Sequence, residues 1–537
     1  MTRIDERVST HVYKVKRISK EEMESIAGVC VYDQPPFCNA ACPLKLDVKA
    51  MLKAAAENDF KKAFKIYESI APFPLILSAG CGAPCEEKCR LCELGDGIAI
   101  GDIERAVALS GGAGEKRSIF RVRKKKKAAV FGSGLFALLL AGELEKKGYP
   151  VTAICGEADE EEYLRVAAGF LREDDFYTEL KRLRGKDIAF EFNAEMTREL
   201  FEEKRGGFDV LCASEKAALD IFPGAVRDEG IMLMESEGLL TGGGETVLEA
   251  ALGARKAALT ADRLAQGIDP RSARGEEGPV TSRLYTNPDL ARGLIRIKGC
   301  ESGYTREQAA EEAGRCMQCH CDECLRGCAY LRRFNKHPGL LSREIYNNTQ
   351  IIMGDHPLNR AMNACALCGQ CTVTCPHGFD MAHVCRTARE NMVDTDKMPL
   401  AAHEFALLDM LFSNGEAYLC RKQPGHSHCR YVFFPGCQAA AIAPEAVIAA
   451  YEDLCTRLKG GVALMLGCCG AIAHWAGRGE MYGEVRDKIA AELAALEDPV
   501  IIAGCPSCMK LLSEQDMAET VGIWTVLRDR GRPDGAR

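Results

Sequence analysis

The chain has 537 residues, enough for roughly three to four domains of about 150 residues each. Hydrophobic residues make up 47% and charged residues 27%, so the chain can bury real cores and is not disordered throughout. The formal net charge is −8, which argues against nucleic acid as a main partner because phosphate binding needs a concentrated positive face.

Cysteine is the unusual residue. The chain has 28 cysteines, most of them gathered in tight blocks that are separated by cysteine-poor stretches. The first residues, MTRIDERVSTHVYKVKRISK, are charged and lack the apolar core of a secretory signal. We therefore expect a cytoplasmic protein whose thiols persist as metal ligands in a reducing compartment. No apolar run reaches the length of about 18 residues that a membrane span needs, so none is expected.

Residues 1–112 are predicted to form a helical iron–sulfur domain. Two cysteine blocks flank a segment, KLDVKAMLKAAAENDFKKAFKIYESI, whose apolar residues recur at helical spacing. Two cubane clusters take eight ligands, and the two blocks supply seven thiols, one fewer than needed. A structural role for one site, with a degraded or zinc-filled cluster, is the alternative. The two blocks supply Cys30, Cys38, Cys42, Cys81, Cys85, Cys89 and Cys92.

Residues 126–268 are predicted to form a Rossmann-like domain, because strand, glycine-turn and helix patterns alternate there. Gly132, Gly134 and Ala137 form a G-x-G-x-x-A motif, which lets backbone N–H groups approach a pyrophosphate at a helix N-terminus. The second strand ends at Cys155, where an acidic residue would hold a ribose. Glu157, two residues later, is the candidate for that role.

Residues 285–410 are predicted to form a helical ferredoxin module. The spacing C-x2-C-x2-C-x3-C-P at Cys365, Cys368, Cys371 and Cys375 is typical of a [4Fe-4S] loop whose fourth thiolate reaches a neighbouring cluster. The upstream block keeps only part of this spacing, because Gln318 occupies the first ligand position, so that Cys316 or Cys319 must substitute. For the motif from Cys365 to Cys375, a structural zinc site is the alternative. The upstream block supplies Cys316, Cys319, Cys321, Cys324 and Cys328.

Residues 428–537 are predicted to form an α/β domain in which cysteines follow apolar strands. Three strand ends carry the sequences PGC, GCCG and CPSC, and thiols from three loops suit a metal cluster. A zinc site or a redox-inert core is the alternative. The candidate metal-binding and catalytic residues here are Cys437, Cys468, Cys469, Cys505 and Cys508.

The N-terminal blocks, with IAIGDIE after them, resemble the iron–sulfur domain of the glutamate synthase small subunit and dihydropyrimidine dehydrogenase. The resemblance implies that an FAD domain follows and that Glu104 is the non-cysteine ligand of one cluster. It groups that carboxylate with Cys42, Cys85 and Cys89. The other cluster would take Cys30, Cys38 and Cys92, completed by Asp33 or Cys81.

The FAD domain of that family carries an inserted NAD(P)H domain, for which residues 128–265 leave no room. The resemblance therefore implies a truncated FAD-type domain, which either keeps FAD or serves as a structural pseudo-domain.

The C-terminal cysteines resemble the cysteine-rich "CCG" domain of the heterodisulfide reductase B subunit. In that enzyme two CCG motifs hold a non-cubane cluster that cleaves a disulfide, whereas this chain has one motif. The preceding ferredoxin block makes the C-terminal half similar to fused C and B subunits.

The expected fold class is multidomain, α/β plus α-helical. The leading hypothesis is a heterodisulfide-reductase-like electron-transfer subunit of a cytoplasmic, anaerobic oxidoreductase complex. It would relay electrons through four to five [4Fe-4S] clusters, one of them non-cubane, and through FAD where that is bound, at about four iron atoms per cluster. Its partners would be other redox subunits, a ferredoxin or a flavoprotein. The alternatives are a self-contained enzyme that reduces a disulfide or thiol-linked substrate, and a structural zinc or iron–sulfur scaffold.

Overall fold

The structure is a computed structural model that describes residues 19–111, 123–272, 274–275, 277–299, 303–399 and 401–531. Most of the glycine- and lysine-rich linker expected near residue 112, and Cys300, lie outside these residues. The chain forms two compact units. We call Val31–Cys321 unit I; unit II combines residues 19–30 with 322–531.

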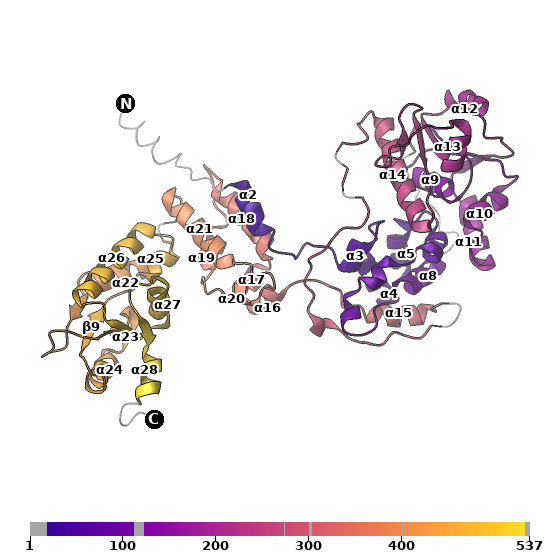
Figure 1. Cartoon of the computed structure of the whole chain (residues 1–537). Coiled ribbons are helices and arrows are strands. Elements are labelled where there is room, and N and C mark those ends of the chain that lie inside the picture. Colours follow the sequence, from indigo (N-terminus) through magenta and orange to yellow (C-terminus); the bar gives the residue numbers. More distant parts are fainter. Residues whose placement is uncertain are drawn as a thin grey trace, which may run out of the picture. The chain divides into compact units, whose positions relative to one another are not determined.

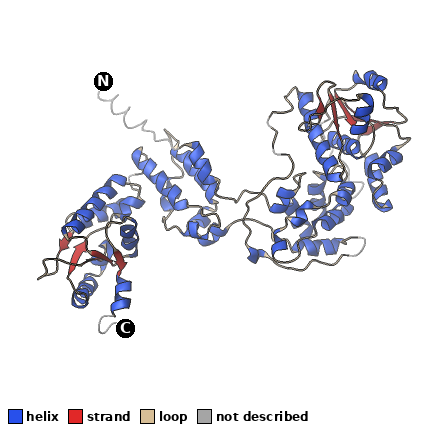
Figure 2. Ribbon diagram, viewed as in Figure 1, coloured by secondary structure: helices blue, strands red, loops and turns tan. Residues whose placement is uncertain are grey.

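The first part of unit I is helical (Figures 1 and 2). The single helix expected between the cysteine blocks is two helices, because the chain turns through Asn58 at a positive φ of 60° and Asp59 caps the second helix. A distant helix, Arg306–Gly314, packs on the first of these two. The helices are α3 (Phe37–Ala41), α4 (Val48–Ala56), α5 (Phe60–Glu68), α6 (Pro74–Gly80), α7 (Pro84–Glu87), η1 (Arg90–Glu93), α8 (Ile100–Ser110), η2 (Pro288–Leu290) and α15 (Arg306–Gly314).

The second part of unit I is a six-stranded sheet in the order β3-β2-β1-β4-β6-β5, with only β5 antiparallel to its neighbour. This doubly wound order confirms the expected Rossmann-like fold. The strands are β1 (Ala128–Phe131), β2 (Val151–Ile154), β3 (Ile188–Glu191), β4 (Val210–Ser214), β5 (Leu233–Met234) and β6 (Leu239–Gly242). The helices are α9 (Leu135–Lys146), α10 (Glu160–Ala168), α11 (Glu173–Arg184), α12 (Arg198–Arg205), α13 (Glu215–Ile221) and α14 (Val247–Gln266).

The two parts of unit I share one hydrophobic core. Gly142 on α9 is one point of contact, since a Cβ there would lie 2.7 Å from the Pro72 side chain. The buried Glu179 of α11 is another: its carboxylate accepts a 2.6 Å hydrogen bond from the Leu75 amide and pairs with Arg182 at 2.9 Å. The sheet and the helical part are therefore one packed body.

Unit II begins with a helical part that has its own core. Its first helix packs on Pro338–Thr349, more than 300 residues later in the chain. The helices are α2 (Lys20–Ala27), α16 (Glu323–Gly327), α17 (Ala329–Phe334), α18 (Pro338–Thr349), α19 (Asn359–Ala364), α20 (Gln370–Thr374), α21 (Met381–Asp394) and α22 (Glu404–Asn414).

Unit II ends in a five-stranded sheet in the order β11-β10-β8-β9-β7, parallel except for β7. Helices flank the sheet (Figure 2), so the multidomain α/β plus α-helical class is confirmed. The strands are β7 (Leu419–Arg421), β8 (Tyr431–Phe434), β9 (Val462–Leu466), β10 (Val500–Ala503) and β11 (Thr520–Gly522). The helices are α23 (Cys437–Ile442), α24 (Pro444–Arg457), α25 (Ala471–Trp475), α26 (Gly479–Ala495), α27 (Pro506–Glu514) and α28 (Ile523–Arg530).

Within the described ranges, none of the helices is both long and apolar enough to cross a membrane.

Candidate iron–sulfur and dinucleotide sites

Three thiols and one carboxylate meet in the helical part of unit I. Cys42 follows α3, Cys81 and Cys85 flank the start of α7, and Glu104 lies on α8. Burial raises the pKa of Cys81 to about 12, and the charge of Glu104 adds to this effect. Burial likewise raises the pKa of Glu104 to about 8, partly offset by the Tyr67 hydroxyl. We call these four residues the Glu104 group.

A second set of four thiols in unit I consists of Cys38, Cys89, Cys316 and Cys319. Burial raises the pKa of Cys38, and the charges of Cys316, Cys319 and Cys89 raise it further because they lie close by. Burial also raises the pKa of Cys316 to about 11, with Cys319 and Cys89 contributing. We call these four residues the Cys38 group.

The turn that brings Cys316 and Cys319 to this place is anchored on α4. The side-chain amide of Gln318, which has a positive φ of 50°, donates to the carbonyl of Lys49 at 3.3 Å and to Cys316 Sγ at 3.4 Å. In return, Lys49 Nζ donates to the carbonyl of Cys319 at 2.9 Å. Gln318 is thus a residue that holds the turn.

The two groups differ from the sets expected by resemblance. Cys81 stands beside Glu104 where Cys89 was expected, and Cys89 lies with Cys38 instead. Cys92 is exposed, with its thiol 3.4 Å from the carbonyl of Glu86, and Asp33 is exposed as well. Cys30 belongs to unit II. The sequence shows a C-x2-C pair at Cys316 and Cys319. Because Cys321 follows only two residues later, spacing alone does not separate this pair from the ferredoxin block.

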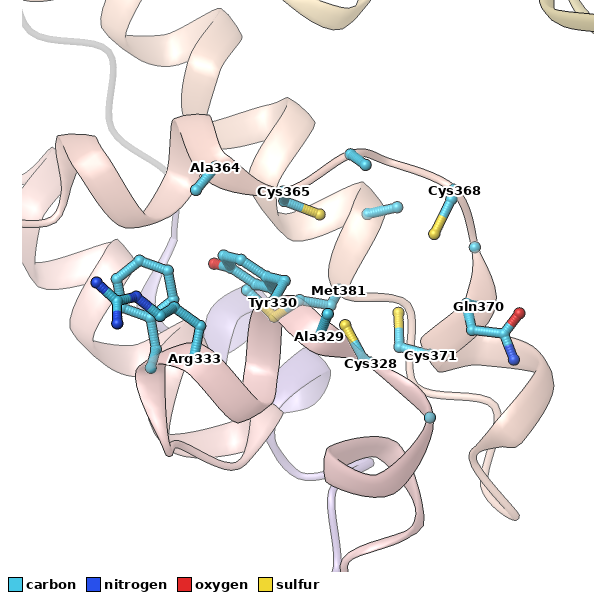
Figure 3. Close-up of a pocket in the computed structure, with 15 residues that line it drawn as sticks. Cys328, Ala329, Tyr330, Arg333, Ala364, Cys365, Cys368, Gln370, Cys371 and Met381 are labelled. Atoms are coloured by element: carbon cyan, nitrogen blue, oxygen red, sulfur yellow. The ribbon is translucent and has the colours of Figure 1, made fainter.

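Four cysteines of unit II surround a cavity of about 600 Å³. Figure 3 shows Cys328 on one side and Cys365, Cys368 and Cys371 around the rest of it, with Tyr330 beside them. This is the arrangement that the ferredoxin spacing predicts, in which one block lends its last cysteine to the other block's site. A hydrogen bond with Cys385 lowers the pKa of Cys365. The donor set and the size of the space fit an iron–sulfur cluster.

The remaining ferredoxin cysteines lie around the same helical core. Cys324 is buried in it and Cys375 is packed against it. Cys321 is the last residue of unit I, directly before unit II resumes at Asp322.

The five cysteines of the C-terminal sheet gather where strands β8, β9 and β10 end. Hydrogen-bond contacts connect Cys437 to Cys468, Cys468 to Cys469, and Cys469 to Cys508. Cys505 joins them through Gly436, where a Cβ would lie 3.0 Å from Cys505 Cβ and 3.3 Å from Cys508 Sγ. Gly436 has a positive φ of 88°, so this close approach needs glycine on two grounds.

Arg389 of α21 connects this region to the cavity of Figure 3. The side chain is 1% exposed, and its guanidinium donates to the carbonyls of Met362 and Cys365 at 2.6–2.9 Å. It also donates to the carbonyl of Trp475, on the helix after the CCG cysteines, at 2.6 Å. One buried cation thus holds the two cysteine-bearing regions against each other.

Among the described residues, no three His, Cys, Asp or Glu side chains are placed to hold a single metal ion.

The glycine turn of unit I fits a dinucleotide. Gly132 has a φ of 84°, and a Cβ there would lie 2.4 Å from Ser214 Oγ, whereas Gly134 has open space around it at the start of α9. Ala137 is fully buried, which allows the helix to pack closely on the sheet. At the end of β2, Cys155 is buried, and Glu157 Oε2 is a buried atom without a hydrogen-bond partner. An unpartnered carboxylate oxygen suits a ribose hydroxyl.

Three segments of the chain match known protein families. Residues 7–112 match the family described as dihydropyrimidine dehydrogenase domain II, 4Fe-4S cluster; residues 315–380 match a 4Fe-4S dicluster domain; and residues 431–513 match the CCG cysteine-rich domain. The resemblances expected from the sequence are confirmed at the level of these three domains. The chain is thus a multidomain iron–sulfur protein.

Similar proteins are subunits of oxidoreductases. The chain is 28% identical over 230 residues to the NADPH-Fe(3+) oxidoreductase subunit beta of Geobacter sulfurreducens, covering 40% of this chain and 33% of that protein. It is 28% identical over 159 residues to the NADP(+)-dependent formate dehydrogenase subunit beta of Moorella thermoacetica, covering 25% and 21%. It is 29% identical over 146 residues to the glutamate synthase [NADPH] small chain of Azospirillum brasilense, covering 25% and 29%. The matches thus span a third or less of these relatives.

Replacing Arg389 tests the connection between the ferredoxin and CCG regions. We expect Arg389→Met to lower the free energy of unfolding of unit II by about 3 kcal/mol, because three buried carbonyls lose their donor. Urea unfolding followed by tryptophan fluorescence measures this, since both tryptophans, Trp475 and Trp524, lie in unit II.

The matched control is Arg386→Met, one helical turn away. The Arg386 side chain is 37% exposed and lies 3.2 Å from His474 Nε2. We expect its loss to cost less than about 1 kcal/mol. Equal unfolding curves for the two variants would contradict the role given to Arg389.

Proposed function

We propose that the chain is an iron–sulfur electron-transfer subunit of an oxidoreductase. The observation that carries the proposal is the cavity lined by four thiols in Figure 3, because ligands from two separate loops surround a space of cluster size. The domain families and the oxidoreductase subunits among the relatives support it. The structural scaffold with zinc remains the competing proposal for the same thiols.

We propose four to five clusters in the chain. The Glu104 group and the Cys38 group each offer four ligands in unit I. The ferredoxin part of unit II would hold two cubanes and the CCG cysteines one cluster of non-cubane type. Thiolate-rich, buried sites of this kind favour low reduction potentials, which the protein tunes through hydrogen bonds and exposure.

The contacts of Arg389 support a direct route from the ferredoxin part to the CCG region. The guanidinium bonds to the carbonyl of Cys365, a candidate ligand, and to the carbonyl of Trp475. A buried positive charge beside both regions stabilises added negative charge, and so favours the reduced state of nearby clusters.

The truncated Rossmann-like domain is proposed to bind FAD. Gly132, Gly134 and Ala137 would hold the pyrophosphate at the start of α9, and Glu157 the ribose. When bound, the flavin would couple two-electron transfer to the one-electron transfer of the clusters. Since the sequence has no second dinucleotide motif, the electron source or sink is proposed to be a partner: another redox subunit, a ferredoxin or a flavoprotein in a hetero-oligomeric, cytoplasmic and anaerobic complex.

A second candidate function is reduction of a disulfide or thiol-linked substrate at the CCG cysteines. A cavity of about 240 Å³ lies between the ferredoxin and CCG loops, with Gly369 on one side and Ser507 on the other. His383, Arg386 and Lys510 line it together with Asp380 and Glu514, so it offers both positive and negative groups to a substrate. Reduction would add two electrons from the chain and two protons to the disulfide, which leaves as two thiols. Cys437, Cys468, Cys469, Cys505 and Cys508 would then be catalytic.

Metal analysis tests the leading proposal. Chain purified without oxygen should hold about 16 to 20 iron atoms, at four per cluster, with matching acid-labile sulfide. Elemental analysis and electron paramagnetic resonance of the dithionite-reduced chain measure this. Iron below about eight atoms per chain, or zinc in its place, would favour the scaffold instead.

Flavin binding has its own test. Anaerobically purified chain should release FAD on acid treatment, and Glu157→Ala should weaken FAD binding about tenfold, as expected for loss of a hydrogen bond to a charged group. Glu161→Ala is the control, because Glu161 lies on α10 and pairs with Arg165 at the surface. A wild-type chain that neither contains nor rebinds flavin would show that the domain is structural.

Disulfide reduction is tested with reduced methyl viologen as the electron donor. If the second candidate holds, the purified chain alone reduces oxidised glutathione, Cys469→Ser abolishes the reaction, and Lys510→Ala raises KM several-fold by removing a positive charge from the cavity. An uncharged disulfide, hydroxyethyl disulfide, serves as control and should not respond to the lysine change. No turnover by the wild-type chain would exclude this candidate for disulfides.

A further inference from the structure

Cys30 lies away from the position that its place in the sequence predicts. It follows α2, whose end is closed by hydrogen bonds from the Val29 and Cys30 amides to the carbonyls of Ile26 and Ala27. Helix α2 packs on α18 of the ferredoxin part. The segment that carries Cys30 is thereby fixed to unit II.

Cys30 can occupy this position because residue 339 is a glycine. A Cβ on Gly339, near the start of α18, would lie 2.9 Å from Cys30 Cβ and 3.0 Å from the carbonyl of Ala27. Contacts this short require a residue without a side chain. Cys30 Sγ lies 3.6 Å from the same point, so the thiol is held at the base of α18.

Two ferredoxin cysteines share the core against which Cys30 packs. Cys324 of α16 is buried there, and Cys375, directly after α20, is packed against it. Helices α16 and α20 touch closely, since a Cβ on Gly327 would lie 2.9 Å from Thr374 Cγ2. Cys324 and Cys375 therefore lie in or directly after two short helices that pack against each other.

The first ferredoxin block lacks one ligand. Its spacing leaves Cys321, Cys324 and, from the other block, Cys375 for one cubane, while Cys328 lines the cavity of the other. The first position of the spacing is Gln318, whose amide is bound to Lys49. The cysteines on either side of it, Cys316 and Cys319, lie in the Cys38 group of unit I. A cubane takes four ligands.

We propose that Cys30 is the fourth ligand of this cubane. It would join Cys324 and Cys375, which belong to the same helical core of unit II. In exchange, Cys316 and Cys319 would serve the Cys38 group. The inference rests on the proposed function, because it assigns a ligand to one of the proposed clusters.

The test compares iron losses in single and double variants of the full chain, purified without oxygen. Cys30→Ser should lose between one and four iron atoms, by conversion to a three-iron cluster or by loss of the cluster. Cys324→Ser should lose a similar amount. If both residues hold one cluster, the double variant loses no more than about four iron atoms. Cys30→Ser combined with Cys38→Ser should lose about eight at most, because two clusters are hit.

Mössbauer spectroscopy of iron-57-labelled chain counts the affected clusters, and circular dichroism confirms that each variant is folded. Cys455→Ser is the control, since Cys455 is half-buried in the C-terminal sheet domain and belongs to none of the ligand groups. Gly339→Ala should also lose iron from the same cluster, because its Cβ displaces Cys30. If Cys30→Ser does not fold, Gly339→Ala takes its place in the test, because this variant keeps every thiol.

Three results would overturn the inference: full iron in both Cys30→Ser and Gly339→Ala; two affected clusters when Cys30→Ser is combined with Cys324→Ser; or one affected cluster when it is combined with Cys38→Ser, which would return Cys30 to the Cys38 group. A wild-type chain without iron would instead overturn the proposed function. The two failures are therefore distinguishable.

Discussion

The burial of thiols beside one another is the constraint on which this structure depends. A buried thiolate is costly, and a second one nearby makes it costlier, which is why burial and neighbouring thiols raise the pKa of Cys38 and Cys316. Such thiols stay protonated at neutral pH unless a cation binds them. Metal binding deprotonates the thiols and adds its free energy to folding. On the proposed function, each cysteine group is therefore both a redox site and a part of the core.

The fold meets this constraint by placing cysteines where helices and strands end. In the C-terminal sheet, β8, β9 and β10 are followed by cysteines, and parallel strands bring their carboxyl ends to one edge. Glycines at those ends, such as Gly436, allow backbone approaches that a side chain would block. Arg389 then fixes this edge against the loop that carries Cys365. A rigid contact of this kind keeps the separation of the two cysteine-bearing regions constant.

The spacing of cysteines in the sequence predicted those sites whose residues lie close together in the chain. The C-x2-C-x2-C-x3-C-P spacing predicted a shared site for Cys365, Cys368, Cys371 and Cys328, and a tight loop and two short helices place these four residues around one cavity. The Rossmann-like domain was likewise predicted from one glycine turn between two apolar strands. Tertiary packing decided the rest. Cys316 and Cys319 join Cys38 because α15 packs on α4, and no spacing rule records that contact. The exchange of Cys81 for Cys89 beside Glu104 has the same origin.

Iron-edge anomalous scattering from crystals of the anaerobic chain would locate iron without assuming any ligand. We expect iron peaks at the Glu104 group, at the Cys38 group, in the cavity of Figure 3 and at the CCG cysteines, with one more beside Cys324. Zinc-edge peaks at these positions, or iron at none of them, would show that the cysteine groups are not iron–sulfur sites.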